Sequence, residues 1–281
     1  MIDLDAYLKR IGHTGPREPT LAVLNALCAA QPAAIAFENI DPFLGRPPSL
    51  ALDAIQAKLV GQRRGGYCYE QNALLRAALL MLGMRVTGLA ARVVWMRPAD
   101  APPRPRSHML LKVELPDAAP GAFIVDAGFG GHLFGAPLRL EPGLAQQAPA
   151  GRERITLDGD GYAVEAELAE AWSPLYRFTL EPHLPADYEP LNWYTATRPG
   201  ALFRHNLMLE RLTPACRASL LNDRLTLRHV GEAAQSRRLE NAAELEAVLD
   251  TWFDLQPPVS ADALFERVPK GLAGAFLPDG S

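Results

Sequence analysis

The spacing of apolar residues changes near Arg85, and this change constrains the fold more than any other feature. Before Arg85, apolar residues recur every three to four positions, which is the period of an amphipathic helix. From Val86 to Leu180 they alternate or form short β-branched runs, which is typical of strands. After Leu180 the two patterns mix. We therefore predict an α+β chain, with helices first, antiparallel strands next and a mixed α/β part last.

Capping and turn residues mark individual elements within these parts. Asp3 and Thr20 are expected helix N-caps, and Asn241 with Glu244 resembles a capping box. The turn from Asp158 to Gly161 is a strong hairpin signal. The expected helices are 4–11, 21–31 (with Pro32 beyond its end), 51–60, 68–82 and one after Asn241; the expected strands are 86–96, 107–115, 122–126, 155–157, 162–166, 175–180 and 224–230.

Charge and composition argue against several functional classes. The 281 residues include 28 basic and 32 acidic ones, a net charge of −4 without a basic stripe, so we expect no nucleic-acid partner. The longest apolar runs fall short of the roughly 20 residues that cross a bilayer, so we expect no membrane span. The acidic N-terminus lacks a signal-peptide pattern, which predicts a cytoplasmic protein. Cys28, Cys68 and Cys216 form neither a disulfide framework nor a zinc pattern, so we expect no metal.

One segment carries the clearest chemical signal: Arg63-Arg64-Gly65-Gly66-Tyr67-Cys68-Tyr69-Glu70-Gln71-Asn72. A helix is predicted to begin at Cys68, where the positive end of the helix dipole favours a thiolate. The two glycines let the backbone turn sharply and let a substrate approach. An activated cysteine also needs a base and an orienting carboxylate. On this segment alone, a small apolar residue at a helix start explains Cys68 equally well.

His108 and Asp126 are the predicted partners of Cys68. His108 begins one expected strand, and Asp126 ends the next, just before a glycine-rich stretch. If the two strands are antiparallel neighbours, the two side chains can meet. Taken singly, His108 also fits an ordinary imidazole at a strand edge, and Asp126 fits a turn residue. The order Cys, His, Asp at the ends of a helix and two strands favours a nucleophilic site.

Five segments together resemble the arylamine N-acetyltransferase family. They occur in the family's order up to about residue 212, while the C-terminal third fits more loosely. The phenylalanine at position 129 resembles the residue that the bacterial members of the family have there. The segments are Phe37-Glu38-Asn39-Ile40-Asp41-Pro42, Arg63 to Asn72, Ser107-His108-Met109-Leu110-Leu111, Val125-Asp126-Ala127-Gly128-Phe129-Gly130, and Asn192-Trp193-Tyr194-Thr195-Ala196-Thr197 with Phe203 beyond.

The resemblance implies acetyl transfer from acetyl-coenzyme A, as co-substrate, to the nitrogen of arylamines, arylhydrazines or heterocyclic amines, in xenobiotic metabolism. It implies a ping-pong reaction through acetyl-cysteine, with Cys68 as nucleophile, His108 as base and Asp126 as orienting acid, arranged as in cysteine proteases. It also implies a helical bundle over 1–84, an antiparallel β-barrel over 85–190 and an α/β lid over 191–281, with a linking helix. The enzyme would act as a monomer or a homodimer.

The same resemblance implies further site residues. Phe37, Val94, Phe129 and Phe203 are expected to form the apolar amine pocket, with core packing as the alternative for each phenylalanine. Glu38 and Arg64 are expected to pair behind the nucleophile and to hold the turn at Gly65 and Gly66.

Coenzyme A contacts are expected from the loop before His108 and from the glycine-rich stretch. Arg104 and Arg106 lie in a proline-stiffened loop, and guanidinium groups bind phosphate bidentately. A solvated charge pair is the alternative for the two arginines. Ser107 and Gly130 complete this set.

Two other functions remain open on the sequence. A hydrolase or a transglutaminase-like acyl transferase could use the same Cys-His-Asp order. A non-catalytic binding module would instead leave Cys68 unreactive.

Overall fold

The computed structural model describes residues 1–98, 100–116 and 121–270. Its first part is mainly helical, with α1 (Leu4–Arg10), α2 (Leu21–Ala34), α3 (Ile40–Phe43), α4 (Leu52–Gln56), which continues as a π-helical turn over Ala57–Gly61, and α5 (Cys68–Met81). Asp3 and Thr20 cap α1 and α2 as predicted, each accepting a backbone hydrogen bond. The expectation that α2 ends before Pro32 is wrong. Pro32 lies in the last turn of α2, where the missing N–H removes only one helical hydrogen bond.

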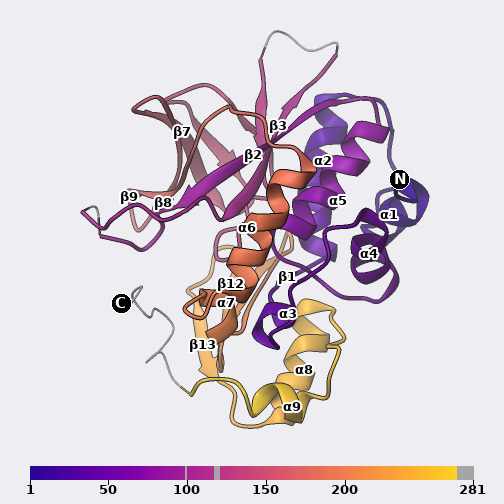
Figure 1. The fold of residues 1–281 in the computed structure, drawn as a ribbon, viewed down its shortest axis with the longest axis vertical. Helices are drawn as coiled ribbons and strands as arrows, with labels where there is room; N and C mark the ends of the chain where they lie inside the picture. Colours follow the sequence, from indigo (N-terminus) through magenta and orange to yellow (C-terminus); the bar gives the residue numbers. More distant parts are fainter. Residues whose placement is uncertain (99, 117–120, 271–281) are drawn as a thin grey trace.

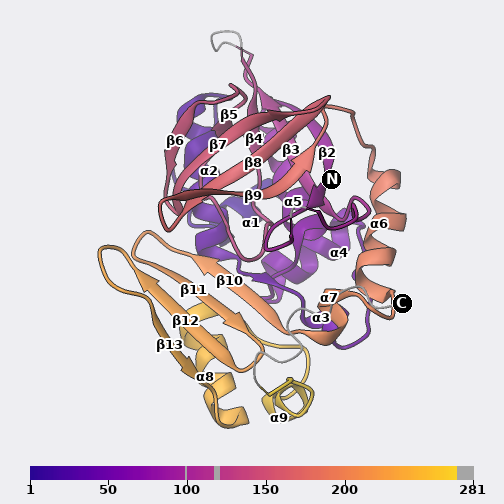
Figure 2. The same ribbon diagram turned by 90° about the vertical axis from the view of Figure 1, so that its left-hand side faces the viewer.

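The second part is an antiparallel eight-stranded sheet that curls into a nearly closed barrel (Figure 2). Its strands are β2 (Arg85–Val93), β3 (His108–Glu114), β4 (Phe123–Val125), β5 (Leu138–Arg139), β6 (Ala145–Ala148), β7 (Gly151–Asp158), β8 (Gly161–Leu168) and β9 (Ala171–Phe178). They follow the order β5-β4-β3-β2-β9-β8-β7-β6. The side chain of Gln146 joins the two edges, because it exchanges hydrogen bonds of 2.7 and 3.0 Å with the backbone of Arg139.

The third part combines a linking helix, a smaller sheet and three further helices. These elements are α6 (Pro185–Thr197), α7 (Leu202–His205), β10 (Met208–Leu212), β11 (Cys216–Leu221), β12 (Arg224–His229), β13 (Gln235–Arg238), α8 (Ala242–Phe253) and α9 (Ala261–Phe265). The sheet has the order β1-β10-β11-β12-β13, in which β1 (Phe37–Glu38) comes from the first part of the chain. Figure 1 shows α6 running from the barrel to this sheet.

Helix α5 is central to the fold because its apolar face packs against β2 and β3. Leu75 and Leu79 of α5 share one buried cluster with Leu111 and Val113 of β3. The predicted α+β class, with its helical bundle, antiparallel barrel and α/β part, is confirmed. The boundaries at 84/85 and 190/191 stay predictions. Across the described residues, none of the helices is both long and apolar enough to span a membrane.

The adjacent residues Leu79 and Leu80 provide a matched test of this core. Leu79 is fully buried, so Leu79→Ala should lower the free energy of unfolding by about 2–5 kcal/mol, through lost burial and a residual cavity. Leu80 is 42% exposed, and Leu80→Ala should change it by less than about 0.5 kcal/mol. Urea unfolding followed by circular dichroism measures both variants. Equal losses would contradict the central position of Leu79.

Candidate active site

Cys68 is the first residue of α5, and its side chain is buried. The helix start is held by Glu70, whose Oε2 accepts the N–H of Tyr67 at 3.1 Å. The Cys68 Sγ lies 3.9 Å from the carbonyl oxygen of Ser107, which precedes β3. The first N–H groups of a helix have no carbonyl partner within it. The sulfur therefore stands at the positive end of the α5 dipole.

The two glycines before Cys68 permit close packing of protein against protein. A Cβ on Gly65 would lie 2.1 Å from the carbonyl oxygen of Ala36, and one on Gly66 would lie 2.8 Å from Oε2 of Glu70. Gly66 also forms a parallel β-bridge with Phe37. Neither glycine lines the cavity described below. Gly65 and Gly66 therefore allow the backbone of Ala36 and the capping carboxylate of Glu70 to lie close to this turn. We had expected them to admit a substrate instead.

A buried charged cluster lies behind this turn. Nε of Arg64 donates to Oε1 of Glu38 at 2.9 Å, so the expected pair is present. Lys58 extends the cluster, with Nζ 2.6 Å from Asp41 and 2.7 Å from Glu70. Lys58 thereby links the capping carboxylate of α5 to the Glu38 and Arg64 pair. Sequence reasoning missed Lys58, because its position depends on the π-helical turn, which the apolar pattern does not reveal.

His108 and Asp126 meet as predicted from neighbouring strands. β3 and β4 pair antiparallel, with Leu111 opposite Val125. His108 begins β3, and Asp126 directly follows β4. The His108 Nε2 and the Asp126 Oδ2 lie 2.6 Å apart, and both side chains are buried.

The Asp126 carboxylate has three further hydrogen-bond donors. Oδ1 accepts from the Asn72 side chain at 3.0 Å and from the N–H of Gly128 at 2.9 Å. Oδ2 accepts from the Tyr176 hydroxyl of β9 at 3.0 Å. Sequence reasoning assigned no role to Asn72, although it lies in the Cys68 segment four positions along the helix. Tyr176 carried no signal, because only the barrel brings β9 to this carboxylate.

These contacts shift the pKa values of both groups. Burial alone would lower the pKa of His108, but the charge and hydrogen bond of Asp126, with a smaller effect of Cys68, raise it from 6.5 to about 10. Burial alone would raise the pKa of Asp126, but His108, Asn72 and the Gly128 N–H together lower it. These contacts favour the imidazolium form of His108 beside the ionised carboxylate of Asp126.

A cavity of about 1400 Å³ opens beside these groups, between the barrel and the smaller sheet. Cys68 and His108 line it, while Asp126 lies behind His108. Of the other predicted site residues, those that line the cavity are Phe37, Arg104, Ser107, Phe129, Gly130 and Phe203. Those that do not are Glu38, Arg64, Gly65, Gly66, Val94 and Arg106.

Two of the expected amine-pocket residues are placed differently from expectation. Phe129 touches the cavity but is only 5% exposed, and its ring packs edge-on against His108, at 5.1 Å between centroids. Its ring also packs against Tyr176 and belongs to the buried apolar cluster of the barrel. Val94 follows the end of β2, and its neighbours Val93 and Trp95 line the cavity in its place.

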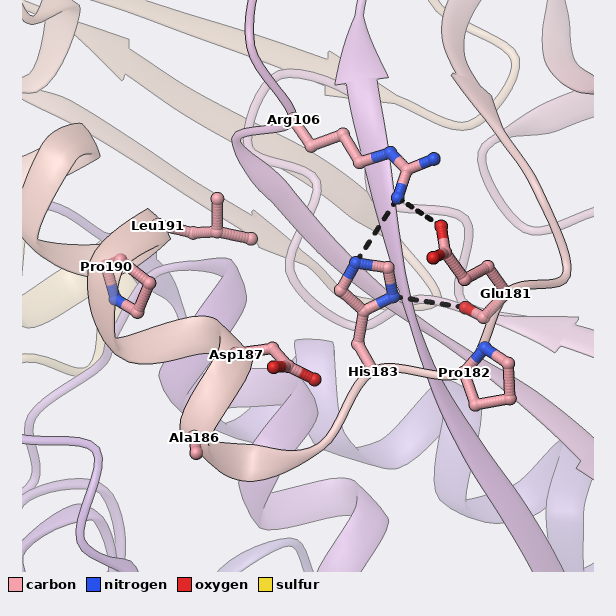
Figure 3. A pocket seen from close by; sticks show the side chains of 8 residues that line it. All are labelled: Arg106, Glu181, Pro182, His183, Ala186, Asp187, Pro190 and Leu191. Carbon is pink, nitrogen blue, oxygen red and sulfur yellow. Dashed lines mark hydrogen bonds and ion pairs between the residues drawn. The ribbon is translucent and has the colours of Figure 1, made fainter.

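Arg106 lies at a separate hollow of about 330 Å³ between the end of the barrel and α6. Figure 3 shows its guanidinium pointing toward Glu181 and His183. Nη1 donates to the Glu181 carboxylate at 2.7 Å. This ion pair turns the side chain away from the cavity, so of the two expected arginines only Arg104 reaches it.

The arrangement has the parts needed for nucleophilic acyl transfer. A thiol stands at a helix N-terminus, an imidazole with a raised pKa shares its cavity, and a carboxylate orients the imidazole.

Comparison with known proteins adds an independent line of argument. The sequence model of a family described as "N-acetyltransferase" matches residues 20–260. The arylamine N-acetyltransferase of Mycolicibacterium smegmatis is 42% identical over 251 residues, covering 89% of this chain and 90% of that protein. The structure of the M. smegmatis arylamine N-acetyl transferase has a TM-score of 0.91 at 39% identity, covering 96% and 100% of the two chains. The Mycobacterium marinum arylamine N-acetyltransferase in complex with CoA has a TM-score of 0.89 at 38% identity, covering 95% and 99%.

The Asp126→Asn variant tests the origin of the His108 shift. It removes the charge that raises the pKa of His108, while the imidazole stays buried, which lowers its pKa. We therefore expect this pKa to fall from about 10 to below 6.5. In the wild type, the raised pKa of His108 adds stability that is fully present below pH 6.5 and is lost as pH rises through about 10; the variant should lack this contribution. An NMR titration of the His108 imidazole measures the pKa.

Asp158→Asn is the matched control, because Asp158 pairs with Arg177 at the barrel surface. It should leave the His108 titration unchanged. A His108 pKa that stayed near 10 in Asp126→Asn would show that Asp126 is not the cause of the shift.

Proposed function

Because the chain belongs to the arylamine N-acetyltransferase family, we propose that it transfers the acetyl group of acetyl-coenzyme A to the nitrogen of arylamines, arylhydrazines or heterocyclic amines through acetyl-Cys68. The observation that carries this proposal is the position of Cys68 and His108 on one cavity wall, with Asp126 bonded behind His108. Cys68 is the nucleophile, His108 is the acid and base, and Asp126 orients and stabilises the imidazolium.

The first half-reaction loads the enzyme. His108 holds the proton of Cys68, and the thiolate sulfur forms a bond to the carbonyl carbon of the acetyl thioester. The bond from that carbon to the coenzyme A sulfur then breaks, and the leaving thiolate takes the proton from His108. The negative charge that develops on the carbonyl oxygen is stabilised by the N–H groups at the start of α5.

The second half-reaction passes the acetyl group to the amine. The amine nitrogen bonds to the acetyl carbon, the bond to Sγ breaks, and an amine proton moves to His108. This restores the thiolate and imidazolium pair. The rings of Phe129 and Tyr176 pack against His108, and Trp95 packs against Phe129. They keep water from this side of the acetyl-cysteine, which favours transfer over hydrolysis.

Coenzyme A fits the charge of the cavity. Its phosphates are anionic, and guanidinium groups bind phosphate well. The arginines that line the cavity are Arg97, Arg104, Arg198, Arg217, Arg224 and Arg228. The coenzyme A complex of the similar M. marinum protein supports the same co-substrate here. We propose Arg104, Ser107 and Gly130 as coenzyme contacts.

Phe203 and Phe37 are the proposed contacts of the aromatic amine. Their ring centroids lie 6.0 Å apart, and Phe203 is half-buried, so part of its ring is open to the cavity. Offset or edge-on contact between aromatic rings contributes about 0.5–1.5 kcal/mol beyond burial. We assign Phe129 a different role, as packing support for His108.

The Cys68→Ser variant tests the covalent step. A hydroxyl is much harder to ionise than a thiol, so transfer should fall by about a thousandfold or more while the fold is kept. Intact-protein mass spectrometry after mixing with acetyl-coenzyme A should show one acetyl group on the wild type and none on Cys68→Ser. Cys216→Ala, away from the site, should still accept one. An acetylated Cys68→Ser variant would place the nucleophile elsewhere, and rapid loss of the acetyl group to water without amine would favour a hydrolase.

Phe203→Ala tests the amine contact. We expect the KM for an arylamine to rise about threefold to tenfold, because one aromatic contact is lost, while the rate of Cys68 acetylation changes little. Rapid mixing separates the two half-reactions. Trp193→Ala is the control, because Trp193 is 63% exposed and does not line the cavity. Equal slowing of both half-reactions in Phe203→Ala would show that Phe203 supports the site without selecting the amine.

A further inference from the structure

The loop over residues 129–133, which follows Asp126, is held by side chains from both sheets. Glu210 of β10 accepts the N–H of Gly131 at 2.5 Å and that of Leu133 at 3.0 Å. Arg217 of β11 donates to the carbonyl oxygen of Gly131 and, at 2.9 Å, to Glu210. His132 reaches the opposite way, into the barrel. Because this loop lines the cavity, its conformation shapes the space that acetyl-coenzyme A would occupy.

The hydrogen bonds of His132 determine its tautomer. Arg217 Nη1 lies 3.2 Å from Nδ1 of His132, and a guanidinium can only donate. Nδ1 therefore accepts, and Nε2 carries the proton and donates to Oε1 of Glu153 at 3.1 Å. Burial, with the charges of Arg217 and Arg228, lowers the pKa of His132 to about 3, so the ring stays neutral.

Glu153 of β7 is the unusual member of this cluster. It is fully buried, and its Oε2 accepts no hydrogen bond from any described residue. The titratable and charged groups that face it are His132 from the loop and Arg217 from β11. The residues opposite it are Ala166 on β8 and Gln146 on β6, whose amide is hydrogen-bonded to the backbone of β5. Burial raises the pKa of Glu153 to about 7, with Arg217 opposing the shift.

The charged neighbours of Glu153 on its own strand belong to other pairs. Arg152 donates to Glu167 at 2.8 Å, and Arg154 donates to Glu165 at 2.6 Å. Successive side chains of a strand point to opposite faces of the sheet, so these arginines lie on the face away from Glu153.

We propose that Glu153, His132, Arg217 and Glu210 form a pH-dependent clasp that positions the 129–133 loop for binding of acetyl-coenzyme A. This proposal rests on the proposed function. With Glu153 ionised, the Arg217 cation lies between two carboxylates, one in direct contact and one through the neutral imidazole. With Glu153 protonated, the Arg217 cation keeps its contacts with Glu210, Gly131 and His132 but loses the attraction of the second carboxylate, and this weakens the anchorage of the loop. Glu153 and His132 are thus positioning residues that touch no reacting atom.

Glu153→Gln is the decisive variant, because it keeps the shape and the acceptor for His132 but cannot ionise. In the wild type, the KM for acetyl-coenzyme A should rise by about threefold or more as pH falls through about 7. In Glu153→Gln it should stay near the acidic wild-type value from about pH 5 to about pH 9, with kcat changed little. Glu165→Gln, on the neighbouring strand, should follow the wild-type profile. A wild-type pH step that persists in Glu153→Gln would overturn the proposal.

Thermal unfolding provides a readout that does not depend on activity. The folded-state pKa of Glu153 lies above its ordinary value of 4.5, so its protonated form favours folding. The Tm of the wild type should therefore fall relative to that of Glu153→Gln as pH rises from 4.5 to about 7 and then level off. A pH-independent difference in Tm would overturn the clasp even if the enzyme is active. A chain that never forms acetyl-Cys68 would instead overturn the proposed function, while this measurement still reports on Glu153.

Discussion

The carboxylate of Asp126 is the junction on which the rest of the site depends. It is buried, and it accepts hydrogen bonds from α5, β3 and β9, through Asn72, His108 and Tyr176. Burial of a charge without such partners would cost free energy, and these hydrogen bonds together offset that cost for the Asp126 carboxylate. Asn72 also donates to the carbonyl of Met109 and accepts the N–H of Ala127. The helix that begins at Cys68 is therefore tied to the strand that begins at His108.

A second buried cluster acts from the other side of the thiol. Lys58 and Arg64 neutralise carboxylates that hold the start of α5 and the neighbouring strand β1. Such pairs add little net stability, because desolvation offsets their attraction, but removal of one partner leaves a buried charge. Cys68 thus lies between two polar clusters with different tasks. The one in front orients the imidazole, and the one behind fixes the backbone.

The sequence allowed prediction of features that depend on local pattern. The caps at Asp3 and Thr20 and the meeting of His108 with Asp126 follow from residues within or beside recognisable segments, while the pairing of Glu38 with Arg64 follows from the family resemblance. Features that depend on long-range packing were not predictable. The burial of Phe129 against His108 is decided by Tyr176 from a distant strand, and the direction of Arg106 is decided by Glu181 beyond the barrel. The pairing of β1 with the smaller sheet could not be predicted either, because a strand of two residues is too short to show a periodic pattern.

That pairing has a consequence for how the chain reaches its native state. Phe37 lies opposite Glu210, while Phe37 also bridges to Gly66 just before the thiol. The short strand from the first part thus has the turn before Cys68 on one edge and a late strand on the other. During synthesis, the second edge stays open until β10 has left the ribosome, although all of α5 is already available. Contacts between residues so far apart in sequence are slow to form, so completion of the thiol's surroundings is among the late events of folding.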